Sequence, residues 1–231
     1  MSNFKADPQE PLQKSVFVRS EGDEWFDRNR IALAESSPLR DSLVERIAQH
    51  LPHGGTTASQ VLEIGCGQGG NLNGLSSVRE IRGSGIDPSG RAVSSGAAAF
   101  PHLELCVGTA DALPYGDGSQ DMVWFGFCLY LVDRSLLQRV VAEADRVLRD
   151  GGLLVVVDFD PLVPCKREYH HKAGLYSYKM DYARLFLANP AYSLVEKYST
   201  SHTTGAWTQD PQERVALTIC YKNMDLAYQP V

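Results

Sequence analysis

The amino-acid sequence predicts an α/β fold, doubly wound around a mostly parallel sheet of seven strands whose C-terminal strand is antiparallel. Short apolar runs alternate with helical segments over residues 61–157, which is typical of consecutive β-α units. The run 153–157 is entirely apolar, as expected of a central parallel strand buried on both faces. Two further strand-like runs, 192–198 and 215–221, are separated by a turn-rich stretch and predict the antiparallel end of the sheet.

The chain begins with a polar segment that contains Pro8 and Pro11, and a dense mixture of charged and aromatic residues follows at 21–30. We expect residues 1–36 to form an N-terminal extension that is partly disordered. Its position makes closure over a functional site, as a lid, a testable hypothesis.

The rest of the chain, 37–231, is expected to be one domain. It opens with a helix over 37–51, where apolar residues recur at helical spacing after a serine and a proline that favour a helix start. A strongly amphipathic helix over 135–149 ends before a pair of glycines. Residues 161–190 lack a clean period, so we expect an insertion there. Between the two helices, the predicted strands are 61–64, 81–86, 103–107 and 121–125.

Composition excludes several classes of protein. The formal net charge of -6 disfavours a nucleic-acid partner, because nucleic-acid binders usually carry a basic face. No apolar run approaches the roughly 20 residues of a membrane span, and no signal peptide is apparent. The 5 cysteines lack C-x-x-C spacing, so we expect no metal, no disulfide and a reduced, cytoplasmic protein. A basic cluster at 166–172 is either a solvated loop or a site for an anionic small molecule.

The segment 61–72 places a glycine-rich turn between a strand and a helix. Gly65, Gly67 and Gly70 satisfy the pattern G-x-G-x-x-G. Such glycines let the main chain turn tightly and leave room for a ligand against bare backbone. Alone, the pattern fits a dinucleotide equally well.

Three acidic residues favour a cationic nucleoside. Glu63, inside the strand, suits a ligand that bears an ammonium and a sulfonium, whereas it would repel a pyrophosphate at the helix N-terminus. Asp87 ends the next strand, about 20 residues on, where a carboxylate can accept both ribose hydroxyls, a feature that fits either cofactor. Asp111, within 108–114, suits an adenine amino group.

With these motifs and the helix, turn and strand at 146–154, the sequence resembles the class I S-adenosylmethionine-dependent methyltransferases over residues 38–160. The resemblance implies a Rossmann-like methyltransferase domain at 37–231, with S-adenosyl-L-methionine as cofactor and S-adenosyl-L-homocysteine as product. By the resemblance, the glycines contact the methionine part, Asp87 binds the ribose, Asp111 and its neighbour bind the adenine, and the residues after the fourth strand line the methyl-bearing end. The expected cofactor-binding residues are Glu63, Gly65, Cys66, Gly67, Asp87, Pro88, Asp111, Ala112, Phe127 and Cys128.

The methyl acceptor is expected at the insertion and the N-terminal extension. A hydroxyl acceptor benefits from a general base, and His170 and His171 are the candidates because imidazoles titrate near neutrality. Their alternative role is that of ordinary surface residues. Tyr130 stands where many relatives have a histidine, and it has packing as its alternative role. The expected acceptor-binding residues are Trp25, Phe26, Arg30, Tyr130, Tyr176, Tyr178 and Lys179.

Segments 22–30 and 176–182 are more loosely similar to a bacterial subgroup found with pseudaminic-acid and surface-polysaccharide pathways. That similarity implies a sugar or another small polar acceptor, and flat aromatic faces pack well against sugar rings. The alternative is that Trp25 and Phe26 only fasten the extension to the domain.

The sequence favours O-methylation of such an acceptor and leaves N-methylation of a small amine or a protein side chain open. An NAD-dependent oxidoreductase and a non-catalytic cofactor-binding protein are the alternatives from other classes. We expect a small-molecule partner, no nucleic acid and no membrane, while the oligomeric state is left open.

Overall fold

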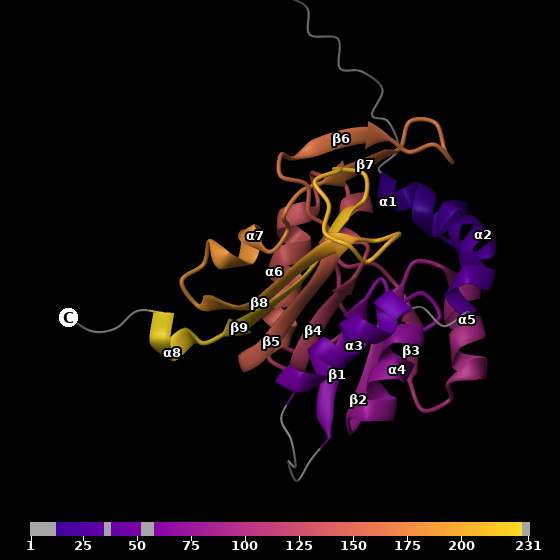
Figure 1. Cartoon of the computed structure of the whole chain (residues 1–231). Helices are drawn as coiled ribbons and strands as arrows, with labels where there is room; N and C mark the ends of the chain where they lie inside the picture. The colour runs from indigo at the N-terminus through magenta and orange to yellow at the C-terminus, as the bar shows by residue number, and fades with distance from the viewer. Residues whose placement is uncertain (1–12, 35–37, 52–57, 228–231) are drawn as a thin grey trace, which may run out of the picture.

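The computed structural model describes residues 13–34, 38–51 and 58–227. In this part of the chain, seven strands form one sheet in the order β3-β2-β1-β4-β5-β9-β8, and two more form a separate hairpin, β6-β7 (Figure 1). Strands β1 to β5 pair in parallel, whereas β9 is antiparallel to both β5 and β8. The predicted fold class, a seven-stranded and mostly parallel sheet with an antiparallel C-terminal strand, is confirmed.

Seven of the strands occupy the runs that their apolar pattern predicts. The full set is β1 (Ser59–Ile64), β2 (Ile81–Asp87), β3 (Glu104–Val107), β4 (Gln120–Gly126), β5 (Leu148–Phe159), β6 (Cys165–Glu168), β7 (Tyr176–Lys179), β8 (Tyr192–Ser201) and β9 (Arg214–Lys222).

Helices cover both faces of the sheet. They are α1 (Gln13–Val16), the π-helix η1 (Phe17–Glu21), α2 (Gly22–Ala34), α3 (Pro38–His50), α4 (Gly70–Val78), α5 (Gly90–Ala99), the 3₁₀ turn η2 (Leu129–Leu131), α6 (Leu137–Val147), α7 (Arg184–Leu187) and α8 (Met224–Ala227).

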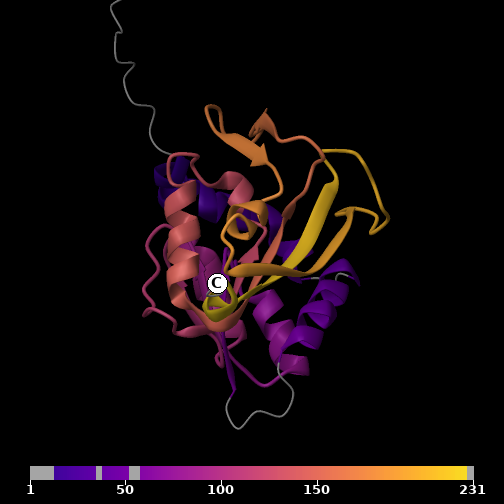
Figure 2. The same cartoon turned by 90° about the vertical axis from the view of Figure 1, so that its left-hand side faces the viewer.

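The core lies in two layers, one on each side of the sheet. Helix α6 buries Val140 and Ala144 against strand residues such as Phe125. On the opposite face, α3 and α4 pack against side chains that include Trp124. Figure 2 shows α6 and the pair α3 and α4 on opposite sides of the sheet. The carboxyl ends of the parallel strands are thereby held at one common edge.

Helix α5 approaches the glycine-rich turn closely. A Cβ at Gly96 would lie 2.4 Å from the carbonyl oxygen of Gln68. Only a glycine permits this packing, which fixes the turn against α5 and the strands β2 and β3.

Three regions differ from the expectation. Residues 13–34 are helical throughout, while the expected disorder of the extension concerns residues outside the described ranges. The helix predicted over 135–149 ends at Val147, and β5 begins at Leu148 because that residue pairs with Gln120. The insertion at 161–190 contains the β6-β7 hairpin, which lies beside α1 (Figure 1). Over the described residues, no helix is long and apolar enough to cross a membrane.

Candidate functional site

A cavity of about 380 Å³ lies where strands β1, β2 and β4 end. Its walls come from four loops at this edge of the sheet and from the helices before α3. The lining includes Gly65, Cys66, Gly67 and Gln68 after β1, Asp87 and Pro88 after β2, Gly108, Thr109, Ala110 and Asp111 after β3, Gly126, Phe127, Cys128 and Tyr130 at the end of β4, and Lys14, Phe17, Gly22 and Trp25 from the N-terminal helices.

Bare main chain forms one wall at the turn after β1. Gly65 and Gly67 have φ values of +75° and +54°, a left-handed conformation that side chains disfavour. A Cβ at Gly65 would collide with the side chain of Cys128, whereas a Cβ at Gly67 would meet no atom within 4 Å. Gly67 therefore leaves open space against backbone, which a ligand can occupy.

Asp87 faces this turn from the end of β2. Its Oδ2 accepts a hydrogen bond of 2.9 Å from the backbone N–H of Gly67, and its Oδ1 accepts one of 2.9 Å from the N–H of Ser89. Burial raises the pKa of the Asp87 carboxyl despite these two donors. Each oxygen keeps a second lone pair for a ligand hydroxyl.

Glu63 lies beneath the cavity rather than in its wall. Its side chain is fully buried, and its Oε1 accepts a hydrogen bond of 2.6 Å from Nδ2 of Asn71, which does line the cavity. Burial raises the pKa of Glu63 to about 8. Its Oε2 has no hydrogen-bond partner among the described residues. We expected Glu63 to contact the cofactor directly, whereas the structure places it behind Asn71.

Asp111 is paired with a lysine from the N-terminal helices. The Nζ of Lys14 lies 2.7 Å from Oδ2 of Asp111, and both residues line the cavity. Burial opposes ionisation of Asp111, but the Lys14 ammonium outweighs it and the pKa of the carboxyl is lowered.

Sulfur and aromatic groups form the end of the cavity at β4. Burial raises the pKa of the thiols of Cys66 and Cys128, so both are neutral, compact side chains. Phe127 has a φ of +60°, a strained conformation for a bulky residue that is often found at functional sites. Its ring lies 5.3 Å from that of Tyr130 and 4.9 Å from that of Phe159. Burial raises the pKa of Tyr130, which keeps its hydroxyl protonated.

The N-terminal helices are docked at the α1 end by Asp133. Its two carboxylate oxygens accept hydrogen bonds of 2.8 and 2.7 Å from the backbone N–H groups of Gln13 and Lys14. The Gln13 side chain binds the backbone of Tyr176 in the hairpin through both its oxygen and its nitrogen.

A second set of contacts fixes α2. Oδ1 of Asp23 accepts hydrogen bonds of 2.7 Å from Oγ of Ser89 and 3.0 Å from the N–H of Arg91, at the start of α5. The buried Glu21 accepts hydrogen bonds from Arg28 and, at 2.9 Å, from the hydroxyl of Tyr169. The helices before α3 therefore bridge α5 and the hairpin across the cavity.

Most of the predicted cofactor residues come together at this cavity. Ala112 is exposed and does not line it; the small residues that do are Thr109 and Ala110.

The predicted acceptor residues are divided. Trp25 and Tyr130 line the cavity, whereas Phe26 is buried outside its wall and Arg30 is exposed. The residues of the hairpin, Tyr176, Tyr178 and Lys179, lie outside the wall as well.

The two candidate bases require a correction. His170 and His171 are exposed in the turn of the hairpin, and neither lines the cavity. His170 lies 3.3 Å from the guanidinium of Arg167, and the ring of His171 packs 5.3 Å from that of Tyr169. Neither imidazole therefore has a place in the cavity wall from which it could take a proton from a bound molecule.

Sequence reasoning missed Lys14, Phe17 and Asp133 in the cavity wall. No local motif marks them, because each reaches the site through contacts between distant parts of the chain. Phe159 was also missed, although its place at the end of a central strand was a usable signal.

Comparison with known proteins agrees with this geometry. Residues 61–152 match the family model described as a methyltransferase domain. The chain is 29% identical over 99 residues to an uncharacterized methyltransferase of Synechocystis sp., a match that covers 43% of this chain and 46% of that protein. It is 31% identical over 135 residues to the 27-O-demethylrifamycin SV methyltransferase of Amycolatopsis mediterranei, covering 54% and 48% of the two chains. The chain thus spans about half the length of the curated relatives it matches.

The fold has a counterpart among solved structures. The 1,6-didemethyltoxoflavin-N1-methyltransferase of Burkholderia thailandensis, solved with its substrate and S-adenosylhomocysteine, superposes with a TM-score of 0.71 over 94% of this chain and 92% of that one. At 14% identity, this likeness concerns the fold alone. The glycine turn, the acids that follow β2 and β3, and the family match together identify residues 61–152 as part of an S-adenosylmethionine-dependent methyltransferase domain.

Proposed function

We propose that this protein transfers a methyl group from S-adenosylmethionine to a hydroxyl group of a sugar or another small polar molecule. The observation that carries the proposal is the cavity itself, where bare backbone at Gly67 shares a wall with the carboxylates of Asp87 and Asp111. Its volume of about 380 Å³ falls in the usual range of small-molecule sites.

The residues present fit the cofactor. The open space over Gly67 would hold the methionine part, and the free lone pairs of Asp87 would accept the ribose hydroxyls. Asp111 would accept from the adenine amino group once Lys14 gives way. The cationic end of the bound cofactor would favour ionisation of the buried Glu63 carboxyl, whose Oε2 has no partner among the described residues. When bound, S-adenosylmethionine supplies a methyl group already activated by its sulfonium.

The N-terminal segment 13–34 acts as a lid in this proposal. Lys14, Phe17 and Trp25 close one side of the cavity, and the contacts of Asp23 with α5 and of Gln13 with the hairpin hold them there. A closed lid excludes water and orients the two reactants, which is the main contribution that a protein makes to this type of reaction.

The acceptor would lie against the aromatic side chains at the β4 end. Trp25, Phe127 and Tyr130 offer flat faces suited to a ring, and Phe159 extends this surface beyond the cavity. The looser resemblance to enzymes of surface-polysaccharide pathways makes sugars the first acceptors to test. We retain a cytoplasmic location in the proposal, supported by five cysteines that are all unpaired.

Transfer to nitrogen is the second candidate. Among the described residues that line the cavity there is no histidine and no glutamate, and Asp133 already accepts two backbone N–H bonds. A neutral amine needs no base, whereas an aliphatic hydroxyl does. The named relatives include proteins of both kinds, one acting at an oxygen and one at N1.

Titration calorimetry tests the cofactor, with S-adenosylhomocysteine expected to bind and NAD not. A panel of hydroxylated sugars, phenols and small amines, followed by release of S-adenosylhomocysteine and mass analysis of products, tests the acceptor atom. Binding of the cofactor without turnover of any member would favour a non-catalytic protein. Limited proteolysis tests the lid, since the bound product should slow cleavage within 13–34, and unchanged cleavage would rule the lid out.

A further inference from the structure

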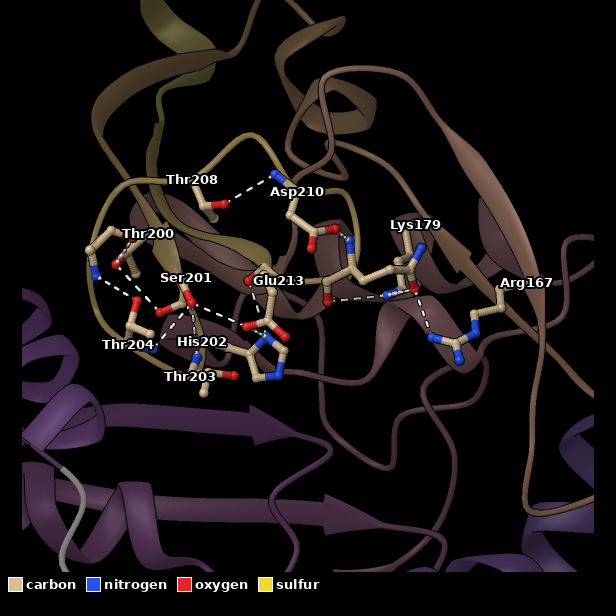
Figure 3. A network of polar contacts seen from close by, with 12 residues as sticks. Arg167, Lys179, Thr200, Ser201, His202, Thr203, Thr204, Thr208, Asp210 and Glu213 are labelled. Carbon is tan, nitrogen blue, oxygen red and sulfur yellow. Dashed lines mark hydrogen bonds and ion pairs between the residues drawn. The ribbon is translucent and has the colours of Figure 1, made fainter.

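A pair of cations converges on one neutral oxygen beside the acceptor end of the cavity. Oε1 of Gln212 accepts a hydrogen bond of 2.8 Å from Nζ of Lys179 and one of 3.0 Å from Nη1 of Arg167. Figure 3 shows both cationic side chains directed at the loop between β8 and β9. Both cationic side chains therefore donate to a neutral amide oxygen instead of to a carboxylate.

Lys179 is buried without a direct ion pair, and the more distant charges of Asp210 and Glu213 offset only part of the cost of its burial. The lysine is only 5% exposed, and neither it nor Arg167 forms an ion pair with any described residue. Burial lowers the pKa of the Lys179 ammonium. A buried cation is costly unless it is paired, so an anion placed beside Lys179 would be stabilised there.

The neighbouring acids are engaged elsewhere. Oδ1 of Asp210 accepts a hydrogen bond of 2.8 Å from the backbone N–H of Gln212. Oε2 of Glu213 accepts one of 3.1 Å from Oγ of Ser201 and lies 3.5 Å from Nδ1 of His202 (Figure 3). Neither carboxylate takes the place between the two cations.

Phe159 connects this place to the cavity. The Nζ of Lys179 lies 3.6 Å from the centre of the Phe159 ring, and the same ring lies 4.9 Å from Phe127 and 5.1 Å from Tyr130. Phe127 and Tyr130 line the cavity. A molecule seated against these rings would reach Lys179 by extending past one aromatic side chain.

We propose that Lys179 and Arg167 bind an anionic group of the methyl acceptor, a carboxylate or a phosphate, in the position that the Gln212 side-chain oxygen occupies. The proposal rests on the proposed function, because it names the class of acceptor for the same site. The two oxygens of a carboxylate, or those of a phosphate, would pair with both cations at once.

Titration with inorganic phosphate and with acetate tests the binding place directly. The side-chain NMR signal of Lys179 is followed in protein saturated with S-adenosylhomocysteine, with chloride keeping the ionic strength constant. We expect the NMR signal of Lys179 to shift until the site is saturated. The anion that binds more tightly identifies the preferred group. A response no larger than that of Lys166, on the other face of the hairpin, would overturn the proposal.

Gln212→Glu supplies the anion from within the chain. The variant should lose the saturable response and raise Tm by about 2 to 4 °C, the shift that one good ion pair gives in a protein of this size. Gln209→Glu is the matched control, since it adds the same charge at an exposed position of the same loop and should change neither property. An unchanged response in Gln212→Glu would contradict the assignment.

Acceptor pairs test the link to methyl transfer. Hydroxylated acids should be methylated at least several-fold faster than their uncharged methyl esters, and Gln212→Glu should remove that preference. Equal rates for acid and ester in the unmodified protein would overturn the proposal even if phosphate binds. Failure of the proposed function would be seen separately, because S-adenosylhomocysteine would then not bind in calorimetry.

Discussion

The ammonium of Lys14 lies 2.7 Å from Oδ2 of Asp111, and so holds the carboxylate that is expected to receive the adenine amino group. The lysine comes from the first described helix, and the aspartate follows the third strand. In the proposed function, a residue of the lid and the cofactor would therefore compete for the Asp111 carboxylate.

Replacing Lys14 should strengthen cofactor binding. In Lys14→Met, Asp111 is free to accept from adenine, and an ion pair of this exposure is worth up to about 1 kcal/mol, or roughly fivefold in Kd. Calorimetry with S-adenosylhomocysteine measures the change. Lys172→Met, which removes a lysine outside the cavity wall, serves as the control. Weaker binding by Lys14→Met would mean that the lysine supports the cofactor instead of competing with it.

A methyl group at Gly67 should block the cofactor while the fold survives. The alanine side chain would enter the open space of the cavity, and the left-handed backbone would cost roughly 1 to 2 kcal/mol. Gly205→Ala is the matched control, since Gly205 has a φ of +71° and no atom within 4 Å of its Cβ position, but lies in an exposed turn. Both variants should lose similar thermal stability. Only Gly67→Ala should lose at least about tenfold in affinity for S-adenosylhomocysteine, a change of about 1.4 kcal/mol.

Removing the charge of Glu63 should stabilise the free protein increasingly as the pH rises. Burial raises the pKa of Glu63 in the folded protein to about 8 from its ordinary value of 4.5. Its stabilising contribution is therefore complete below pH 4.5 and is lost as the pH rises to 8, because the unfolded chain gives up the proton first. The Tm advantage of Glu63→Gln over the unmodified protein should grow between pH 5 and pH 8. Glu80→Gln, at an exposed position, is the control for the substitution itself. A Tm difference that does not change with pH would show that folding does not raise the pKa of Glu63.

The two hairpin histidines should be dispensable for methyl transfer. Both are exposed and outside the cavity wall, so His170→Ala and His171→Ala should keep turnover and cofactor affinity within about twofold, the range of ordinary surface substitutions. Release of S-adenosylhomocysteine with the best acceptor of the panel measures turnover. A collapse of turnover with unchanged cofactor affinity would return the role of base to one of them.

The sheet and the cofactor wall could be predicted because their signals are local. Apolar runs mark the strands, and Gly65, Gly67 and Asp87 lie at the ends of two adjacent parallel strands, whose carboxyl ends necessarily meet at one edge. Glu63 was predicted to contact the cofactor directly, but it lies behind the cavity wall. Its position inside β1 buries it below the turn, and Asn71 stands between it and the cavity.

The acceptor side could not be predicted because it depends on contacts between distant segments. Lys14 and Asp133 meet across 119 residues, and no sequence period reports such a contact. In the hairpin, the register pairs Lys166 with Tyr178 on one face and Cys165 with Lys179 on the other. One residue of shift would exchange the two faces, and the turn that fixes the register carries no distinctive sequence.

The bridge from α5 to the hairpin has a kinetic consequence. Asp23 fastens the N-terminal helices to α5 and Gln13 fastens them to the hairpin, so in the proposed function this one segment stands over the place of both reactants. We expect one opening movement of this segment to admit the cofactor and to release both products. The rate of turnover would then be set by how long the segment stays closed rather than by the methyl-transfer step.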